Sequence, residues 1–345
     1  TLHTVTLVGW FLPSLSLIVL LELTEAQFEE TLLEPIPHAV NSSWQELWLT
    51  RLRMGELPGL ATCLVPVLIV ACLADLSTFL LGEGRESKLL LGGLCIVSIS
   101  VFLVLLPNFF ARWIGAQACQ DGELRDQIAK FRGQLKLSRI EVRIVKTSTR
   151  WQGAAIVGWF PGFRHLWIGE GLLQRLDPQE VDMVVMHELA HVTRNHFLWR
   201  FLPILIAAFA LVGGFATPWI VPPAWQATAL QWAQIAGVAA STLCLVLGVS
   251  WIAKRCELDA DRHACDLASR VCPWAQGSAP RAAVKLGDAL SKLIGDSPDA
   301  ARASWLHPSL ATRLNHLRDH AQHMRRRQAA TNLPQPTAAE QQTIE

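Results

Sequence analysis

The chain has 345 residues, of which 51% are hydrophobic and 17% charged, and its formal net charge is +1 at pH 7. Soluble proteins carry about 25% charged residues, so this composition argues against an ordinary soluble protein and against disorder over most of the chain. The near-zero net charge also gives no basic field of the kind that favours nucleic acid.

Uncharged apolar segments recur along the chain, and about 20 such residues suffice to cross a bilayer. They predict five membrane spans: 4–21, 58–80, 89–111, 199–217 and 230–252. The alternative for each is a buried helix of a soluble core. A second alternative for 4–21 is a cleaved signal peptide. This alternative is disfavoured because no positively charged n-region precedes the apolar residues. Tryptophans, which favour the membrane interface, stand at span ends: Trp113, Trp199, Trp219, Trp225 and Trp251.

Lysine and arginine are distributed unevenly between the two predicted sides of the membrane. Five spans place residues 1–3, 81–88 and 218–229 on one side, which carries only Arg85 and Lys88. The other side carries a larger set, which includes Arg51, Arg53, Arg112, Arg194, Arg200, Lys254 and Arg255. The positive-inside rule therefore predicts that the polar bulk faces the cytoplasm, as expected for a bacterial cytoplasmic membrane protein.

The polar segments show the periods of helices and strands. Apolar spacing predicts an amphipathic helix over 121–136, a strand over 140–144, and a strand pair from 153–160 and 165–168. Asp177-Pro178-Gln179-Glu180 combines a cap, a first-turn proline and a capping box, so it predicts a helix over 178–198. Two further helices are expected, one leaving the fifth span through about 268 and one over about 280–294.

The helix that begins at Asp177 carries His187-Glu188-Leu189-Ala190-His191. A spacing of four residues puts the two imidazoles on one helix face, where both can bind one zinc ion. Glu188 projects to the side and can act on a water beside the metal. This HExxH pattern predicts the metal ligands His187 and His191 and the catalytic base Glu188.

A third ligand is needed for a zinc site with one open position. A metzincin would need Gly at 194 and His at 197, where the chain has Arg194 and Phe197. Glu257 and Asp261 stand four residues apart beyond the fifth span, so Glu257 is the predicted ligand and Asp261 the predicted acceptor behind a ligand imidazole. The alternative for Glu257 is a solvated charge near the membrane surface.

Three motifs in this order resemble those of integral-membrane zinc metallopeptidases, the family typified by HtpX and the CAAX prenyl proteases. They are His187–His191, Glu257-Leu258-Asp259-Ala260-Asp261, and Trp305-Leu306-His307-Pro308-Ser309 with Arg313. The resemblance covers about 120–318. The chain differs where relatives often carry Asn, at Gly153, and where they commonly carry Tyr, at Leu258.

The resemblance implies roles for further residues. His307 is the candidate partner of the oxyanion, with Arg313 second, because the sequence contains no Tyr. The alternative for His307 is a structural histidine before proline. A peptide substrate is expected to add as a strand beside Ala154, Ala155, Ile156 and Val157.

We therefore expect an α-helical membrane protein of about five spans with a mainly α, α+β zincin-like metallopeptidase domain. Its expected parts are a membrane region (1–111), a first catalytic half (112–198), a membrane hairpin (199–252), a second catalytic half (253–318) and a disordered polar tail (319–345).

The expected function is a zinc metalloendopeptidase that uses one zinc ion and cleaves membrane or misfolded proteins, with the bilayer and not nucleic acid as its other partner. Two alternatives are open: a signal-transducing receptor-peptidase of the beta-lactam-sensor type, and a non-catalytic membrane scaffold.

Overall fold

The computed structural model describes residues 85–146, 153–220, 226–295 and 302–331, together with short helical pieces between 68 and 82. The predicted span 4–21 and most of the span 58–80 lie outside the described residues. The chain forms two compact units: one of 1–119, 139–148 and 157–167, and one of 120–138, 149–156 and 168–345. The second unit holds the HExxH helix.

The first unit contains a long helix and strands. Helix α4 (Arg85–Trp113) covers the third predicted span, and β1 (Gln117–Ala118) pairs antiparallel with β2 (Ile140–Val145), with Gln117 opposite Ile144. Together with β3 (Ala154–Val157) and β4 (Arg164–Gly169), these strands form a sheet of order β1-β2-β4-β3. Strand β3 is therefore an edge strand among the strands that the structure describes.

A glycine shapes the turn after β3. Gly158 has a φ of +122°, and a Cβ on it would lie 2.6 Å from the carbonyl oxygen of Phe163. Both the backbone conformation and the close approach exclude any larger residue. The turn thus supports the predicted strand pair.

In the second unit, α5 (Gly122–Gln134), α6 (Glu170–Arg175) and α7 (Pro178–Thr193) precede the apolar segment. The predicted capping box is present: Asp177 Oδ1 accepts from the Glu180 N–H at 2.9 Å, and Glu180 Oε2 accepts from the Asp177 N–H at 2.9 Å. Lys292 holds the same glutamate at 2.6 Å, which ties the start of α7 to a later helix.

The prediction of one helix over 178–198 is wrong at its end. Helix α7 stops at Thr193, and α8 (His196–Ile220) begins after a break of two residues. Asn195 has a φ of +51°, a left-handed conformation that Asn tolerates better than most residues and that ends helices. Helical periodicity does not show such a break, because the apolar pattern resumes at once.

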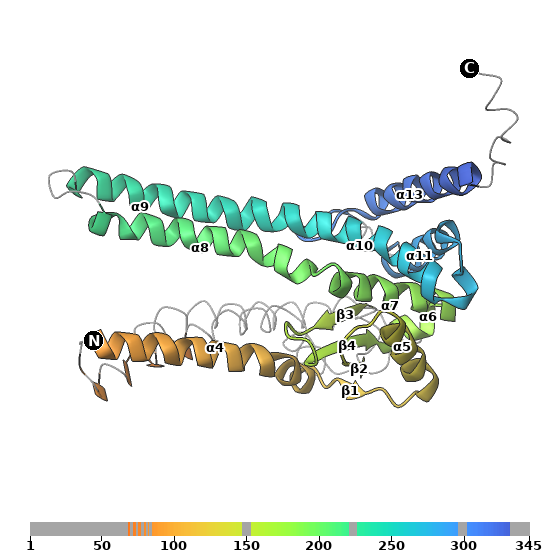
Figure 1. Cartoon of the computed structure of the whole chain (residues 1–345), viewed down its shortest axis with the longest axis horizontal. Helices are drawn as coiled ribbons and strands as arrows, with labels where there is room; N and C mark the ends of the chain where they lie inside the picture. Colours follow the sequence, from red (N-terminus) through yellow and green to blue (C-terminus); the bar gives the residue numbers. More distant parts are fainter. Residues whose placement is uncertain are drawn as a thin grey trace, which may run out of the picture. The chain divides into compact units, whose positions relative to one another are not determined.

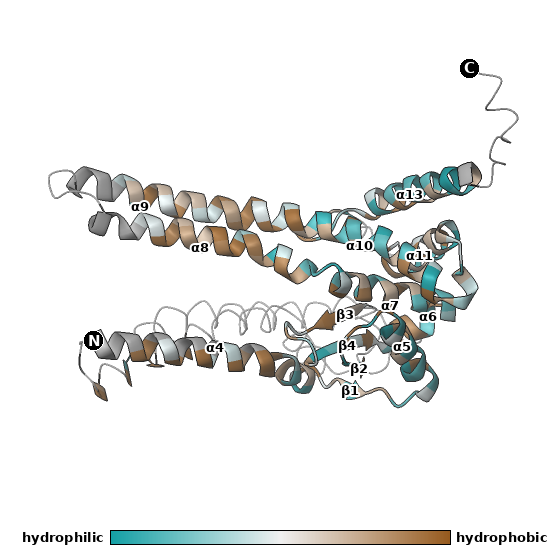
Figure 2. Cartoon of the chain, viewed as in Figure 1, coloured by the Kyte–Doolittle hydropathy of each residue, from teal (hydrophilic) through white to brown (hydrophobic). Residues whose placement is uncertain are grey.

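Helices α8 and α9 (Gln226–Leu243) lie side by side and form an apolar hairpin (Figure 1). Glycines permit the close approach: a Cβ on Gly214 would lie 2.7 Å from the carbonyl oxygen of Ala233. Large apolar side chains face outward, with Phe209 68% and Trp232 67% exposed. Figure 2 shows the resulting hydrophobic colouring along both helices. Such outward apolar surface is expected in lipid and not in a soluble core.

Two helical segments are long and apolar enough to cross a membrane among the residues that the structure describes, His196–Gly214 and Trp232–Val271. They correspond to the predicted spans 199–217 and 230–252. The third predicted span is helical, but its passage through a membrane stays a prediction, as does the total of five.

Beyond α9 the helix continues through a π-helical segment, η2 (Cys244–Gly248), into α10 (Val249–Val271). The short turn η3 (Pro273–Ala275) leads to α11 (Ala279–Ile294), and α13 (Leu310–Thr331) completes the described part of the chain. Helices α10 and α11 pack on α7, and α13 packs on α11. Their buried small residues, such as Ala260, Ala264, Ala282 and Ala289, allow this close packing.

The tail is more ordered than the sequence predicts. We predicted disorder over 319–345, but residues up to Thr331 belong to α13. Leu317 and Ala321 of this helix are buried, so packing on α11 stabilises a segment whose composition alone is polar.

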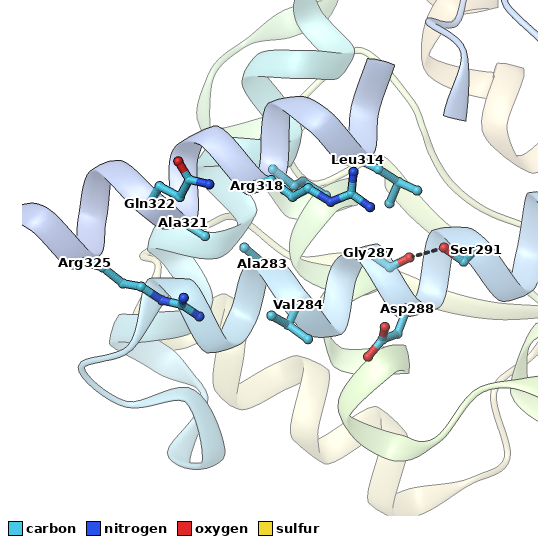
Figure 3. Close-up of a pocket in the computed structure, with 11 residues that line it drawn as sticks. Ala283, Val284, Gly287, Asp288, Ser291, Leu314, Arg318, Ala321, Gln322 and Arg325 are labelled. Atoms are coloured by element: carbon cyan, nitrogen blue, oxygen red, sulfur yellow. Dashed lines mark hydrogen bonds between the residues drawn. The ribbon is translucent and has the colours of Figure 1, made fainter. Parts of the chain in front are cut away.

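Helices α11 and α13 also enclose a cavity of about 300 Å³, shown in Figure 3. Its lining includes Asp288, Arg318 and Arg325 and none of the predicted site residues. This cavity is therefore separate from the site described below.

Asp182 of α7 is a buried carboxylate, 5% exposed, that accepts from Gln127 Nε2 at 2.6 Å and Trp274 Nε1 at 2.9 Å. Burial raises the pKa of Asp182 from 3.8 to about 6, against the smaller opposing effect of the two neutral donors. The folded protein therefore favours the protonated form of Asp182. The free energy of unfolding that this preference contributes is fully present below pH 3.8, and it is lost as the pH rises through about 6.

We expect this loss to amount to about 1 kcal/mol between pH 5 and pH 7, which shifts the melting temperature by roughly 2–4 °C. Thermal unfolding of the purified protein in detergent at pH 5 and at pH 7 measures this shift in melting temperature. Asp182→Asn should lack the part of the shift that comes from Asp182. Asp126→Asn, which changes an exposed carboxylate, is the matched control. An unchanged pH dependence in Asp182→Asn contradicts the assignment.

Candidate active site

Helix α7 brings His187 and His191 to one face, with their Nε2 atoms 3.2 Å apart. Helix α10 supplies Glu257, whose Oε2 lies 3.6 Å from His187 Nε2 and whose Oε1 lies 3.5 Å from His191 Nε2. One ligand atom from each of the three residues falls within 4.8 Å of the others. Two imidazoles and one carboxylate are a donor set that zinc prefers, and an ion on all three leaves an open position.

Asp261 lies behind His187. Its Oδ1 lies 3.0 Å from His187 Nδ1, on the side of the ring opposite Nε2. Arg313 of α13 holds both oxygens of Asp261, with Nε at 2.8 Å and Nη2 at 2.6 Å. This bidentate pair is buried and fixes the carboxylate that orients the ring. Arg313 is thus committed to Asp261, which disfavours it as the second candidate for the oxyanion.

His191 has a different partner, which the sequence did not predict. His196 Nδ1 lies 2.9 Å from His191 Nδ1, and His196 Nε2 lies 3.0 Å from Asp259 Oδ2. When His191 binds a metal through Nε2, its Nδ1 carries the proton and can donate to His196, whose Nε2–H then donates to Asp259. Arg194 completes the chain, because its Nε donates to Asp259 Oδ2 at 2.8 Å.

A role for His196 as a structural or capping residue that faces away from the ligands does not agree with this contact. A residue five positions beyond His191 would face elsewhere on a continuous helix. The break at Asn195 redirects the chain so that His196 returns to His191. In the sequence, only Arg194-Asn195 indicates this helix break, and the indication is weak.

Glu257 is held from two sides. Arg200 of α8 donates from Nη2 to Oε1 at 2.6 Å, and His307 Nδ1 lies 3.4 Å from Oε2. Burial opposes the charge on Glu257, but His187, His307 and the nearby positive charges outweigh it and lower the pKa of Glu257 well below its usual value. The sequence did not predict this contact of Arg200, which entered there only as one of the positive charges on the predicted cytoplasmic side.

The segment that carries His307 is fixed to the π-helical turn η2. Trp305 Nε1 donates to the Val246 carbonyl oxygen at 2.9 Å, and Ser250 Oγ donates to the Trp305 carbonyl oxygen at 2.7 Å. The His307 side chain remains 56% exposed.

Glu188 lies at the open edge of β3. Its Oε2 accepts from the Ile156 N–H at 3.0 Å. The Gly153 carbonyl oxygen accepts from the Gly169 N–H at 2.9 Å, so residue 153 faces β4. Backbone groups alternate along a strand, which makes Ala154 and Ile156 face the open edge. The predicted substrate strand thus ends beside the predicted base.

The charges of the site are strongly coupled. Burial raises the pKa of Glu188 to about 7, only partly offset by the positive charge on His187 and the bond from Ile156. For His187, burial lowers the pKa, but Asp261 and Glu257 outweigh it and raise the pKa above its ordinary value. Burial and the positive His187 together lower the pKa of His191. Metal binding to these imidazoles would require neutral rings and would therefore displace the proton that His187 otherwise holds.

Replacing His196 by Ala removes the partner of His191 Nδ1. Loss of such a partner typically weakens metal binding about 10–100-fold, and we expect a loss of this size in zinc affinity. Competition with a chromogenic chelator measures it. His263→Ala on α10, outside the ligand cluster, is the control. Equal zinc affinities of the two variants contradict the role of His196.

An HExxH helix whose two histidines lie beside a glutamate from a later helix is an arrangement typical of metallopeptidases. Comparison with known proteins agrees: residues 119–321 match peptidase family M48, and the chain belongs to this family. The match covers more than half of the sequence. It favours a metallopeptidase of this family over a receptor-peptidase of the beta-lactam-sensor type and over a non-catalytic scaffold.

The CAAX prenyl protease 1 homolog of Arabidopsis thaliana is 29% identical over 124 residues, which are 35% of this chain and 28% of that protein. The chain therefore matches less than a third of the length of this curated relative. The crystal structure of S. mikatae Ste24p matches with a TM-score of 0.46 and 16% identity over 79% of this chain and 66% of that one.

Proposed function

We propose that the chain is a membrane-embedded zinc endopeptidase that cleaves peptide bonds in membrane or unfolded proteins. The observation that carries the proposal is the cluster of His187, His191 and Glu257 with Glu188 beside it, at the open edge of β3. Membership of family M48 supports the same chemistry.

Zinc at this site would polarise the carbonyl of the scissile bond and lower the pKa of an attacking water toward about 7. Glu188 takes the proton of that water and later delivers it to the leaving amine.

The substrate enters as an extended strand along β3. Ala154 and Ile156 present their main-chain groups to the open edge, while Ala155 and Val157 face the sheet. Such pairing requires a locally unfolded segment of the substrate and gives affinity through the backbone, which suits a protease of broad specificity.

In the structure, the Glu188 carboxylate accepts the hydrogen bond of the Ile156 N–H. A substrate strand that pairs there releases the carboxylate toward the water. Binding of substrate and availability of the base are thereby linked.

His307 is the proposed partner of the oxyanion. Its ring lies beside Glu257 Oε2 at 3.4 Å and is exposed, while the docking of Trp305 on η2 fixes its backbone. Catalysis needs a hydrogen-bond donor beside the developing oxyanion. Tyr cannot supply it because the sequence contains none, so we assign this role to His307.

We also propose that α8 and α9 cross the membrane and that the active site faces the cytoplasm. The exposed apolar side chains of the hairpin support insertion. The asymmetry of Lys and Arg supports the orientation.

Removal and return of the metal test the function. The purified protein is expected to contain about one zinc per chain and to cleave an unfolded reporter protein such as a casein. A strong chelator should abolish cleavage, and zinc at one equivalent should restore it, because the donor set is complete within the chain. Activity that survives complete removal of zinc contradicts the proposal.

A further inference from the structure

A second cavity, of about 520 Å³, lies between α8 and α10. Its volume falls in the range of roughly 300–1,000 Å³ that small ligands occupy. Arg194, His196 and Asp259 line one part, and Trp199, Trp251 and Arg255 line another. The cavity is thus bounded by polar groups that stand behind His191 and by aromatic groups where the apolar hairpin ends.

The cavity carries one positive charge that the protein does not neutralise. Arg194 is paired with Asp259, with its Nε at 2.8 Å from Oδ2. Arg255 instead lies over the ring of Trp251, 4.4 Å from its centroid, and no ion pair to it is found in the described part of the chain. Stacking on Trp orients the guanidinium and leaves its N–H donors available for an anion.

The same cavity opens onto lipid-facing surface. Trp199 and Trp251 are each 58% exposed, and Leu202, one turn into α8, is 39% exposed. Residues 201–253 contain no formal charge, whereas Lys254 and Arg255 follow at once. The cavity therefore lies where a membrane-spanning hairpin leaves the hydrocarbon, with tryptophans at the depth that they favour.

We propose that this cavity binds one anionic phospholipid. Arg255 pairs with the phosphate, and the acyl chains lie along Trp199 and Leu202 on the outside of α8. A free phosphate offers the same charge but leaves the apolar side of the cavity uncovered, so we commit to the lipid. The inference rests on the proposed membrane insertion and does not rest on peptidase activity.

Native mass spectrometry of the full chain in non-ionic detergent tests the proposal, with dioleoyl phosphatidylglycerol and dioleoyl phosphatidylcholine as the two probes. We expect phosphatidylglycerol to bind at least tenfold more tightly. Arg255→Ala should lose at least tenfold of that affinity. Lys254→Ala is the matched control, since it removes the same charge one position away outside the cavity lining, and should change affinity less than twofold.

Three results overturn the proposal: equal affinity for the two lipids, equal losses in the two variants, or displacement of phosphatidylglycerol by millimolar inorganic phosphate. If Arg255→Ala does not fold, Trp251→Leu replaces it, with Trp232→Leu on the outside of the hairpin as control. Glu188→Gln should bind the lipid like the wild type, so that loss of peptidase function and loss of lipid binding are separate outcomes.

Discussion

Glu188→Gln is expected to lower the rate of peptide cleavage by about 10²–10⁴-fold while zinc stays near one ion per chain. The amide has the size of the carboxylate but cannot take a proton from water. Glu188 does not belong to the cluster of His187, His191 and Glu257, so this variant should still bind zinc. Cleavage of an unfolded reporter protein and elemental analysis of the same preparation measure both quantities.

Glu123→Gln is the matched control for this variant, because it makes the same change in the first turn of α5. Wild-type activity in Glu188→Gln would contradict the proposed base. Loss of zinc together with activity would also contradict it, since Glu188 would then support the metal. The inactive variant also serves to identify substrates, by comparing the proteomes of cells that express it or the wild type.

Glu257→Gln is expected to weaken zinc binding by roughly 100-fold or more and to remove activity in proportion. Zinc sites in small domains bind with about 10–16 kcal/mol, so one of a few ligands carries about 3 kcal/mol. Gln keeps the volume of the side chain but loses the charge that Arg200 and His307 surround. Competition with a chelator of known affinity measures the change.

Asp266→Asn, on the same helix α10, is the matched control, because it removes a carboxylate charge away from the ligand cluster. Circular dichroism and gel filtration show whether either variant still folds. Full zinc affinity in a folded Glu257→Gln protein would show that the third ligand is another residue.

The local elements of the candidate site could be predicted from the sequence because they follow from short-range chemistry. The cap at Asp177 fixes where α7 begins, and the spacing of His187 and His191 then fixes their common face. Glu257 was predicted from the need for a third ligand and from its spacing to Asp261, since 66 residues separate it from His191 and no periodicity links the two.

The remaining groups depend on tertiary contacts that no local pattern specifies. His196 reaches His191 only because the chain breaks at Asn195, and Arg200 reaches Glu257 only because α10 returns past α8. The order of residues 319–331 likewise comes from packing on α11 and not from composition. The roles of the site residues themselves stay predictions until the variants above are measured.

The position of the apolar hairpin between the ligands has a consequence for the time at which the protease becomes active. His187 and His191 leave the ribosome before α8 and α9, whereas Glu257 and the pair of Asp261 and Arg313 follow them. A chain whose hairpin has not folded back therefore lacks the complete cluster of His187, His191 and Glu257. Folding of the hairpin must precede assembly of the site that we propose for catalysis.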